Sequence, residues 1–143
     1  MKKRLLILFT NIFVCMFFSA TLIIAADMPE EIAMESDVYS THKKPIIKFT
    51  HVKHAKDYSI ACAECHHDYQ DGKNIWKQGD AVLKCSGCHS GAKKPKDVEM
   101  SKAEAMKKYH YTAIHANCKG CHTALKKEGK DTGPTTCTKC HVK

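Results

Sequence analysis

The sequence predicts a small fold made mostly of loops, with a few short helices and a short N-terminal β-hairpin. Three observations predict this fold class. A five-residue pattern, Cys-x-x-Cys-His, occurs four times in a chain of 143 residues. Segments with glycine and proline separate several of the copies, as expected for loops. Apolar residues after position 26 are sparse and scattered, so they cannot form an ordinary hydrophobic core. Something other than side chains must therefore supply the centre of the fold.

Each copy of the pattern has the residues that covalent attachment of a c-type haem requires. Two thiols three positions apart can each add to one vinyl group of a porphyrin, and the next residue, His, can then ligate the iron. The attachment cysteines would be Cys62, Cys65, Cys85, Cys88, Cys118, Cys121, Cys137 and Cys140, and the motif ligands His66, His89, His122 and His141. The pattern predicts four covalently bound haem c groups, around which the chain packs.

Paired cysteines also occur in disulfide frameworks and in zinc sites. Neither explains why a His directly follows the second Cys in all four copies, because a disulfide has no use for it and zinc usually takes a His at longer spacing. A zinc- or disulfide-stabilised binding module is therefore the weaker alternative, from a different functional class.

The N-terminal residues 1–26 have the pattern of a signal peptide. Positions 2–4 are basic, positions 5–24 form an apolar run, and two alanines end the segment. We expect cleavage and export to the periplasm, which leaves residues 27–143 as a single tetrahaem domain without a membrane anchor. An uncleaved anchor is the alternative, because the apolar run approaches the length of a membrane span. Cys15 lies in this segment and has no partner in the motifs.

The first part of residues 27–143 contains candidate distal ligands. Residues 27–44 are polar and acidic and are expected to form an extended or loose arm. Residues 45–49 are β-prone and fit the predicted hairpin. His51 and His54 follow at a spacing of three, so on a helical turn both rings would lie on one side and could reach two adjacent irons. Phe49 beside them could pack on a porphyrin.

The later segments alternate loops with one good helix. Residues 68–84 are predicted to form turns, in which Ile75, Trp76, Val82 and Leu83 supply local packing. Residues 101–116 have the strongest helical signal, because Ser101 is a good N-cap and Glu104 completes a capping box. Residues 123–136 are expected to form the last loop.

The number of histidines permits two imidazole ligands for every iron. Residues 27–143 contain ten histidines, of which four belong to the motifs. Four six-coordinate irons need four more, from His42, His51, His54, His67, His110 and His115. Methionine is the rival sixth ligand and would raise the reduction potential. Met28, Met34, Met100 and Met106 are available, but they do not stand in a repeated arrangement.

The order of these motifs resembles the tetrahaem class III cytochromes c, the cytochrome c-three family. The resemblance rests on Phe-x-His-x-x-His from Phe49, on Cys-x-x-Cys-His-His at 62–67 and on the three further haem motifs, and it covers about residues 45–143. It implies a small multihaem cytochrome fold with four closely packed, low-potential, bis-His haems. It also implies ligand pairs: His66 with His51, His89 with His67, His122 with His54, and His141 with a histidine upstream of the third motif.

The last ligand is where the sequence departs from the tetrahaem pattern. His115 lies three residues before Cys118, a local spacing that is more similar to the trihaem cytochrome c-seven relatives. We therefore expect His115 to ligate the fourth haem, with His110 as the competitor. His42 and His110 would then be surface histidines, or His110 would stack or hydrogen bond beside a haem.

Charge is distributed unevenly along the chain. Residues 27–83 have a net charge of −3 and residues 84–143 a net charge of +8. Haem propionates would offset much of the positive charge, so the basic composition is no argument for nucleic-acid binding. A Lys-rich surface in the C-terminal half could steer an acidic partner. A solvated face that only keeps the protein soluble is an equal alternative.

These observations favour electron transfer over catalysis. A six-coordinate haem has no open position for a substrate, which argues against an oxidase, peroxidase or gas-binding protein. The resemblance implies a periplasmic electron carrier of anaerobic, sulfate- or metal-reducing respiration. Its partners would be a hydrogenase, a formate dehydrogenase or a membrane-bound multihaem complex. Direct reduction of soluble metal ions is the alternative within redox chemistry.

Overall fold

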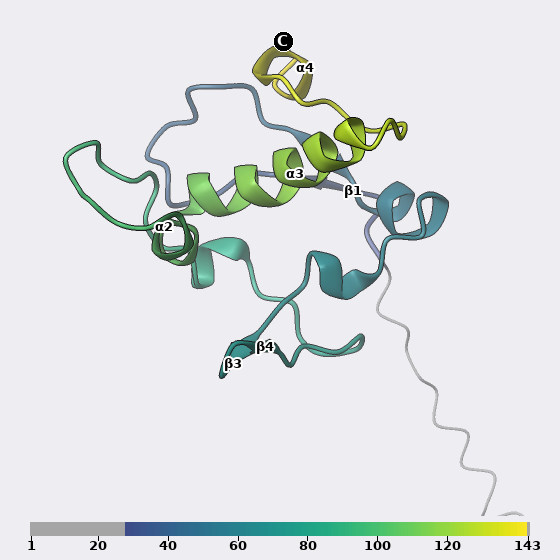
Figure 1. Cartoon of the computed structure of the whole chain (residues 1–143), viewed down its shortest axis with the longest axis horizontal. Helices are drawn as coiled ribbons and strands as arrows, with labels where there is room; N and C mark the ends of the chain where they lie inside the picture. Colours follow the sequence, from purple (N-terminus) through teal and green to yellow (C-terminus); the bar gives the residue numbers. More distant parts are fainter. Residues whose placement is uncertain (1–27, 143) are drawn as a thin grey trace, which may run out of the picture.

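The computed structural model describes residues 28–142, so the predicted signal peptide and Cys15 lie outside the described residues. The central element is the helix α3 (His110–Lys127), and the shorter elements and loops surround it (Figure 1). The other elements, in chain order, are β1 (Glu31–Ala33), β2 (Lys48–Thr50), the π-helical turn η1 (Lys53–Asp57), the 3-10 turn η2 (Cys62–Glu64), β3 (Tyr69–Gln70), β4 (Lys73–Asn74), the 3-10 turn η3 (Cys85–Gly87), α2 (Lys102–Lys108) and α4 (Cys137–Cys140). The predicted class of a loop-rich fold with few helices is confirmed.

The predicted N-terminal strand pair is present. Strand β1 pairs antiparallel with β2, with Glu31 opposite Thr50 and Ala33 opposite Lys48. The arm is therefore not loose throughout, because part of it is a strand, and the Met34 N–H donates to the Ile47 carbonyl at 2.8 Å just beyond the ladder. This pairing fixes the start of the following segment, which carries His51 and His54.

A second strand pair, β3 with β4, was not expected from the sequence, which predicted only turns over residues 68–84. The two residues that connect the strands, Asp71 and Gly72, have φ values of 50° and 76°. Positive φ at both central residues is the requirement of a type I′ hairpin turn, and Asp-Gly is a preferred pair for it. The signal for this hairpin was therefore present in the sequence.

The helix predicted over residues 101–116 is two helices, and the second extends further than expected. The capping box is as predicted: the Glu104 N–H donates to Ser101 Oγ at 3.2 Å, and Glu104 Oε2 accepts from the Ser101 N–H at 2.8 Å. Tyr109 then takes an extended conformation (φ −110°, ψ 120°) that ends α2. Helix α3 continues through the third motif to Lys127, so the last loop begins later than residue 123.

The break at Tyr109 is caused by the loop at Gly91. The Gly91 N–H donates to the Lys108 carbonyl at 3.0 Å, and the Gly91 carbonyl accepts from the His110 N–H at 2.7 Å. A Cβ at position 91 would lie 2.7 Å from the Tyr109 ring, so only glycine permits this approach. The loop therefore hydrogen bonds to the Lys108 carbonyl and the His110 N–H, two groups that a continuous helix would have paired within itself.

The described residues contain almost no apolar core. Ala105 (4% exposed) and Tyr109 (7%) are the buried hydrophobic residues of this part of the chain. The sequence prediction that Val82 and Leu83 pack locally is wrong for the polypeptide alone, since they are 59% and 74% exposed. Leu83 lies two residues before Cys85, so we expect an attached haem to cover it. This supports the expectation that haem faces, and not side chains, form the centre of the fold.

One buried polar contact holds the N-terminal arm on α3. The Tyr39 hydroxyl lies 3.1 Å from Nδ1 of His110, which is only 8% exposed, and the two rings pack edge to face at 5.5 Å. The Tyr39 ring also packs on His42 at 5.3 Å, and Nε2 of His42 accepts from the Ser36 N–H at 3.5 Å. The prediction that His110 is a surface histidine is therefore wrong. His110 is a buried, hydrogen-bonding histidine, and its place beside a haem stays a prediction.

Tyr39→Phe is expected to lower the free energy of unfolding of the haem-loaded protein by about 1 kcal/mol, because it leaves a buried imidazole nitrogen without its partner. Burial lowers the pKa of His110 below its ordinary 6.5. Protonation therefore favours the unfolded chain, and this part of the stability is fully present above about pH 6.5 and is lost as the pH falls below that value. Denaturant titrations above and below that pH measure both effects. Tyr69→Phe is the control, because Tyr69 is 66% exposed; an equal loss there would contradict the assignment.

Candidate haem-binding sites

Three of the four motifs form a single helical turn, and the third is part of a long helix. Motifs one, two and four lie at η2, η3 and α4, and motif three lies inside α3. In the three separate turns the His backbone N–H donates to the carbonyl of the first Cys: His66 to Cys62 at 2.8 Å, His89 to Cys85 at 2.9 Å and His141 to Cys137 at 2.9 Å. The turn brings two thiols and the following imidazole together, as one covalently attached haem requires.

The structure places four pairs of imidazole rings close together, and each pair joins a motif histidine to a histidine from another segment. The ring-centroid distances are 6.0 Å for His51 and His66, 6.1 Å for His67 and His89, 6.3 Å for His54 and His122, and 6.3 Å for His115 and His141. Three of these pairs are those that the resemblance to the tetrahaem family implied, and the fourth joins His141 to His115, the histidine that we expected from the trihaem-like spacing.

The separation of the rings fits an iron between them. A metal–imidazole nitrogen bond is roughly 2.0–2.1 Å long, as it is for zinc, and the ring centroid lies somewhat farther from the metal. Two imidazoles on opposite sides of one ion therefore have centroids roughly 6 Å apart. All four pairs have this spacing, although their interplanar angles range from 25° to 83°. The residues present therefore fit bis-His ligation of four haems.

Most of the paired imidazoles are oriented by a backbone carbonyl. In four histidines Nδ1 lies close to a carbonyl oxygen: His54 to Thr50 (2.8 Å), His115 to Tyr111 (2.8 Å), His122 to Pro134 (2.9 Å) and His141 to Pro45 (2.9 Å). In two others the contact is longer: His89 to Lys107 (3.1 Å) and His51 to Pro29 (3.3 Å). A ring that donates from Nδ1 keeps Nε2 free for the metal. The carbonyls that orient His54 and His115 lie four residues earlier and are local, whereas the other four come from distant segments and could not be identified from the sequence.

His66 and His67 have aromatic neighbours instead. The Trp76 ring stacks on His66 with a centroid distance of 4.9 Å and an interplanar angle of 28°. The Tyr69 ring lies 5.3 Å from that of His67. Burial lowers the pKa of His66, which favours the neutral imidazole that a metal requires. Sequence analysis assigned Trp76 only to local packing and missed its contact with a motif ligand.

Gly133 is a further site residue that sequence analysis did not single out. A Cβ at position 133 would lie 2.5 Å from the His122 ring, a contact that real structures do not show. The glycine therefore lets the loop approach close enough for the Pro134 carbonyl to reach His122 Nδ1. The only sequence signal was the Gly-Pro dipeptide of a turn.

The arrangement of cysteines does not support the alternatives. The eight motif cysteines form no disulfide with one another, so each sulfur is available for a bond to haem. Among residues 28–142, no three His, Cys, Asp or Glu side chains are placed to hold a bare metal ion. A zinc module would therefore lack a ligand set in this part of the chain.

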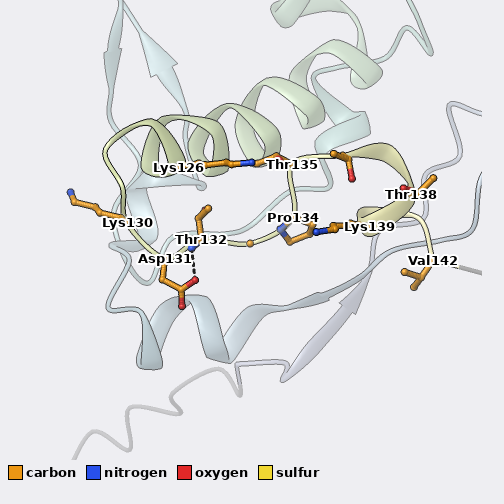
Figure 2. Close-up of a pocket in the computed structure, with 11 residues that line it drawn as sticks. Lys126, Lys130, Asp131, Thr132, Pro134, Thr135, Thr138, Lys139 and Val142 are labelled. Atoms are coloured by element: carbon orange, nitrogen blue, oxygen red, sulfur yellow. Dashed lines mark hydrogen bonds between the residues drawn. The ribbon is translucent and has the colours of Figure 1, made fainter.

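A cavity of about 680 Å³ lies beside the last loop and α4 (Figure 2). Its walls contain the exposed lysines Lys126, Lys130 and Lys139 with several threonines. In Figure 2 the side chains of Lys126 and Lys139 extend toward residues 134–135. None of the described helices is long and apolar enough to cross a membrane.

Comparison with known proteins places these features in one family. The model of the class III cytochrome C family matches residues 26–141. A cytochrome c3 of Maridesulfovibrio salexigens is 34% identical over 123 residues, which cover 82% of this chain and 97% of that protein. The 26 kDa cytochrome c3 of Desulfomicrobium norvegicum is 29% identical over 119 residues, which cover 81% and 96%.

A solved structure supports the fold. The di-tetraheme cytochrome c3 of Desulfovibrio gigas superposes with a TM-score of 0.53 at 21% identity, over 80% of this chain and 97% of that one. The prediction of a small multihaem cytochrome fold is confirmed, and so are the cofactors, four covalently bound haem c groups. The chain belongs to the class III cytochrome c family.

Proposed function

We propose that this protein is a periplasmic, low-potential electron carrier with four bis-His haems. It would move electrons between a hydrogenase or another dehydrogenase and membrane-bound redox complexes in anaerobic respiration. Members of the cytochrome c3 family are electron carriers, which supports the general role. The observation that carries the proposal is the set of four imidazole pairs with centroids 6.0–6.3 Å apart. A fully ligated iron leaves no position for a substrate.

When bound, the haems supply reversible one-electron chemistry at iron. The chain's own residues set how easily that chemistry occurs. Two imidazoles hold iron at a lower potential than a His/Met pair does. The helical turns of the motifs fix each proximal imidazole, and the backbone carbonyls fix the direction of the ring. The small number of residues per haem keeps the ligand pairs close to one another.

The proposal is tested on the purified, haem-loaded protein. A reductive titration should take up four electrons per chain, the visible spectrum should be low-spin in both states, and carbon monoxide should not bind. The intact mass should equal residues 27–143 plus four haems if the signal segment is removed. Carbon monoxide binding by the unaltered protein, or a high-spin spectrum, would contradict bis-His ligation of all four haems.

The proposed docking surface is the lysine group Lys126, Lys127 and Lys139. Two of these residues line the cavity beside α4, and all three are exposed. Lys126 and Lys127 lie a few residues after the third motif, and Lys139 lies inside the fourth. An acidic partner at this surface would therefore be near two haem sites. Positive charge on one face steers an oppositely charged partner and increases its association rate.

Changing these three lysines to glutamate is expected to slow reduction by an acidic partner such as a hydrogenase by roughly tenfold or more at low ionic strength. The difference should shrink as salt is added, because screening removes steering. Stopped-flow reduction measures the rate. The matched control changes Lys43, Lys44 and Lys77 to glutamate, three exposed lysines of the acidic half with the same total charge change. Equal slowing in both variants would mean that net charge, and not this surface, determines the rate.

A further inference from the structure

We propose that hydrogen bonds to the axial histidines divide the four haems into two pairs. The haems of the third and fourth motifs would have lower reduction potentials than those of the first and second motifs. In the partly reduced protein, electrons would therefore reside mainly on the first two. This inference rests on the bis-His ligation proposed above and adds an order that neither the motifs nor the family resemblance supplies.

All four ligands of the third and fourth motifs have short contacts to carbonyls. The pair His54 and His122 has Nδ1–oxygen distances of 2.8 Å and 2.9 Å, to Thr50 and Pro134. The pair His115 and His141 has distances of 2.8 Å and 2.9 Å, to Tyr111 and Pro45. Both imidazoles of each pair therefore donate a well-formed hydrogen bond.

The ligands of the first and second motifs are held less strongly. His51 and His89 have longer contacts to carbonyls, at 3.3 Å and 3.1 Å. His66 and His67 face Trp76 and Tyr69, and no described residue accepts a hydrogen bond from their Nδ1. Each of these pairs therefore has one weaker hydrogen bond where the other pairs have two good ones.

The difference acts on the iron through the ligand. A carbonyl that accepts the Nδ1 proton makes the imidazole more basic and a stronger electron donor. Stronger donation stabilises the ferric state, because that state has the higher positive charge, and so lowers the reduction potential. Two such bonds per iron have a larger effect than one weak bond.

Surface charge acts in the opposite direction. Residues 84–143 are Lys-rich, and positive charge near a haem favours the reduced state. These lysines are mostly exposed, so water and salt weaken their effect on the irons. Each hydrogen bond is made by the imidazole that ligates the iron, so water and salt do not weaken its effect on the iron in this way. We therefore expect the hydrogen bonds to decide the order.

The test is nuclear magnetic resonance of the unaltered protein, with each haem followed separately during a reductive titration. When two electrons have entered, the ratio of reduced to oxidised iron should be roughly tenfold higher for the first and second haems than for the third and fourth. In the fully reduced, diamagnetic protein, the Nδ1 protons of His54, His115, His122 and His141 should exchange slowly with solvent, and those of His66 and His67 rapidly.

Gly133→Ala gives a second test, because a Cβ at that position collides with the His122 ring and disturbs its bond to Pro134. The variant should raise the potential of the third haem relative to the other three. Thr136→Ala is the control, since Thr136 is exposed in the same loop as Gly133, lies outside the four motifs and makes no capping hydrogen bond with its side chain.

An order with the third and fourth haems reduced first, or slow exchange at all eight ligands, would overturn the inference. If either result came with four-electron uptake and no carbon monoxide binding, the proposed carrier function would stand and only the ranking would fail. If carbon monoxide bound the unaltered protein, the ligation itself would be wrong, and the ranking would fail with it.

Discussion

A chain made without haem is expected to remain unfolded. In the described residues only Ala105 and Tyr109 are buried apolar side chains, and no side chain is less than 2% exposed. The strand pairs have two or three residues per strand, which is too short for independent stability in water. The hydrophobic contribution that normally offsets chain entropy is therefore missing. Haem faces covering exposed side chains such as Leu83 and Val142 would supply it.

The experiment compares residues 27–143 produced in the cytoplasm, where the haem is not attached, with the same residues matured in the periplasm. Far-ultraviolet circular dichroism of the haem-free chain should show little helix, and heating should give no cooperative transition. Part of α3 could form transiently, because helix propensity acts locally, but most of the stability of a helix in a protein comes from tertiary packing, which the haem-free chain lacks. A cooperative unfolding transition in the haem-free chain would show that the polypeptide has a core of its own.

The parts of the fold that could be predicted are those whose cause is local. Each attachment turn is contained in five residues, and the capping box at Ser101 and Glu104 spans four. The ligand pairs are different, because His54 and His122 come from distant parts of the chain and spacing alone does not join them. The family resemblance implied these pairs, and the structure brings their rings together. The assignment of each ring to an iron stays a prediction.

The parts that could not be predicted depend on contacts between distant segments. The break at Tyr109 follows from Gly91, which hydrogen bonds to the backbone of Lys108 and His110, the residues on either side of Tyr109. The carbonyl that orients His141 belongs to Pro45, 96 residues earlier. The burial of His110 depends on Tyr39 in an arm that the sequence described only as polar. The β3–β4 hairpin is the exception, because the Asp-Gly pair in its turn is a local signal for a hairpin.

His115→Ala is expected to open one iron out of four. The His115 ring lies 6.3 Å from that of His141, and its Nδ1 contacts the Tyr111 carbonyl at 2.8 Å, which directs Nε2 outward. Removing the imidazole leaves that iron with one protein ligand, so the oxidised protein should show a high-spin fraction of about one quarter. The reduced protein should bind one carbon monoxide per chain, and the potential of that haem should rise, because it loses an electron-donating ligand.

The matched variant is His110→Asn, which removes the competing histidine five residues earlier. Nδ1 of His110 is occupied by the Tyr39 hydroxyl at 3.1 Å, and its ring packs on Tyr39 and not on a motif histidine. This variant should therefore lose some stability, remain low-spin and bind no carbon monoxide. The opposite pattern, with carbon monoxide bound by His110→Asn and not by His115→Ala, would give the fourth haem to His110. Because the two effects differ in kind, a spectroscopic change in one and a stability change in the other, a general loss of folding cannot imitate the expected result.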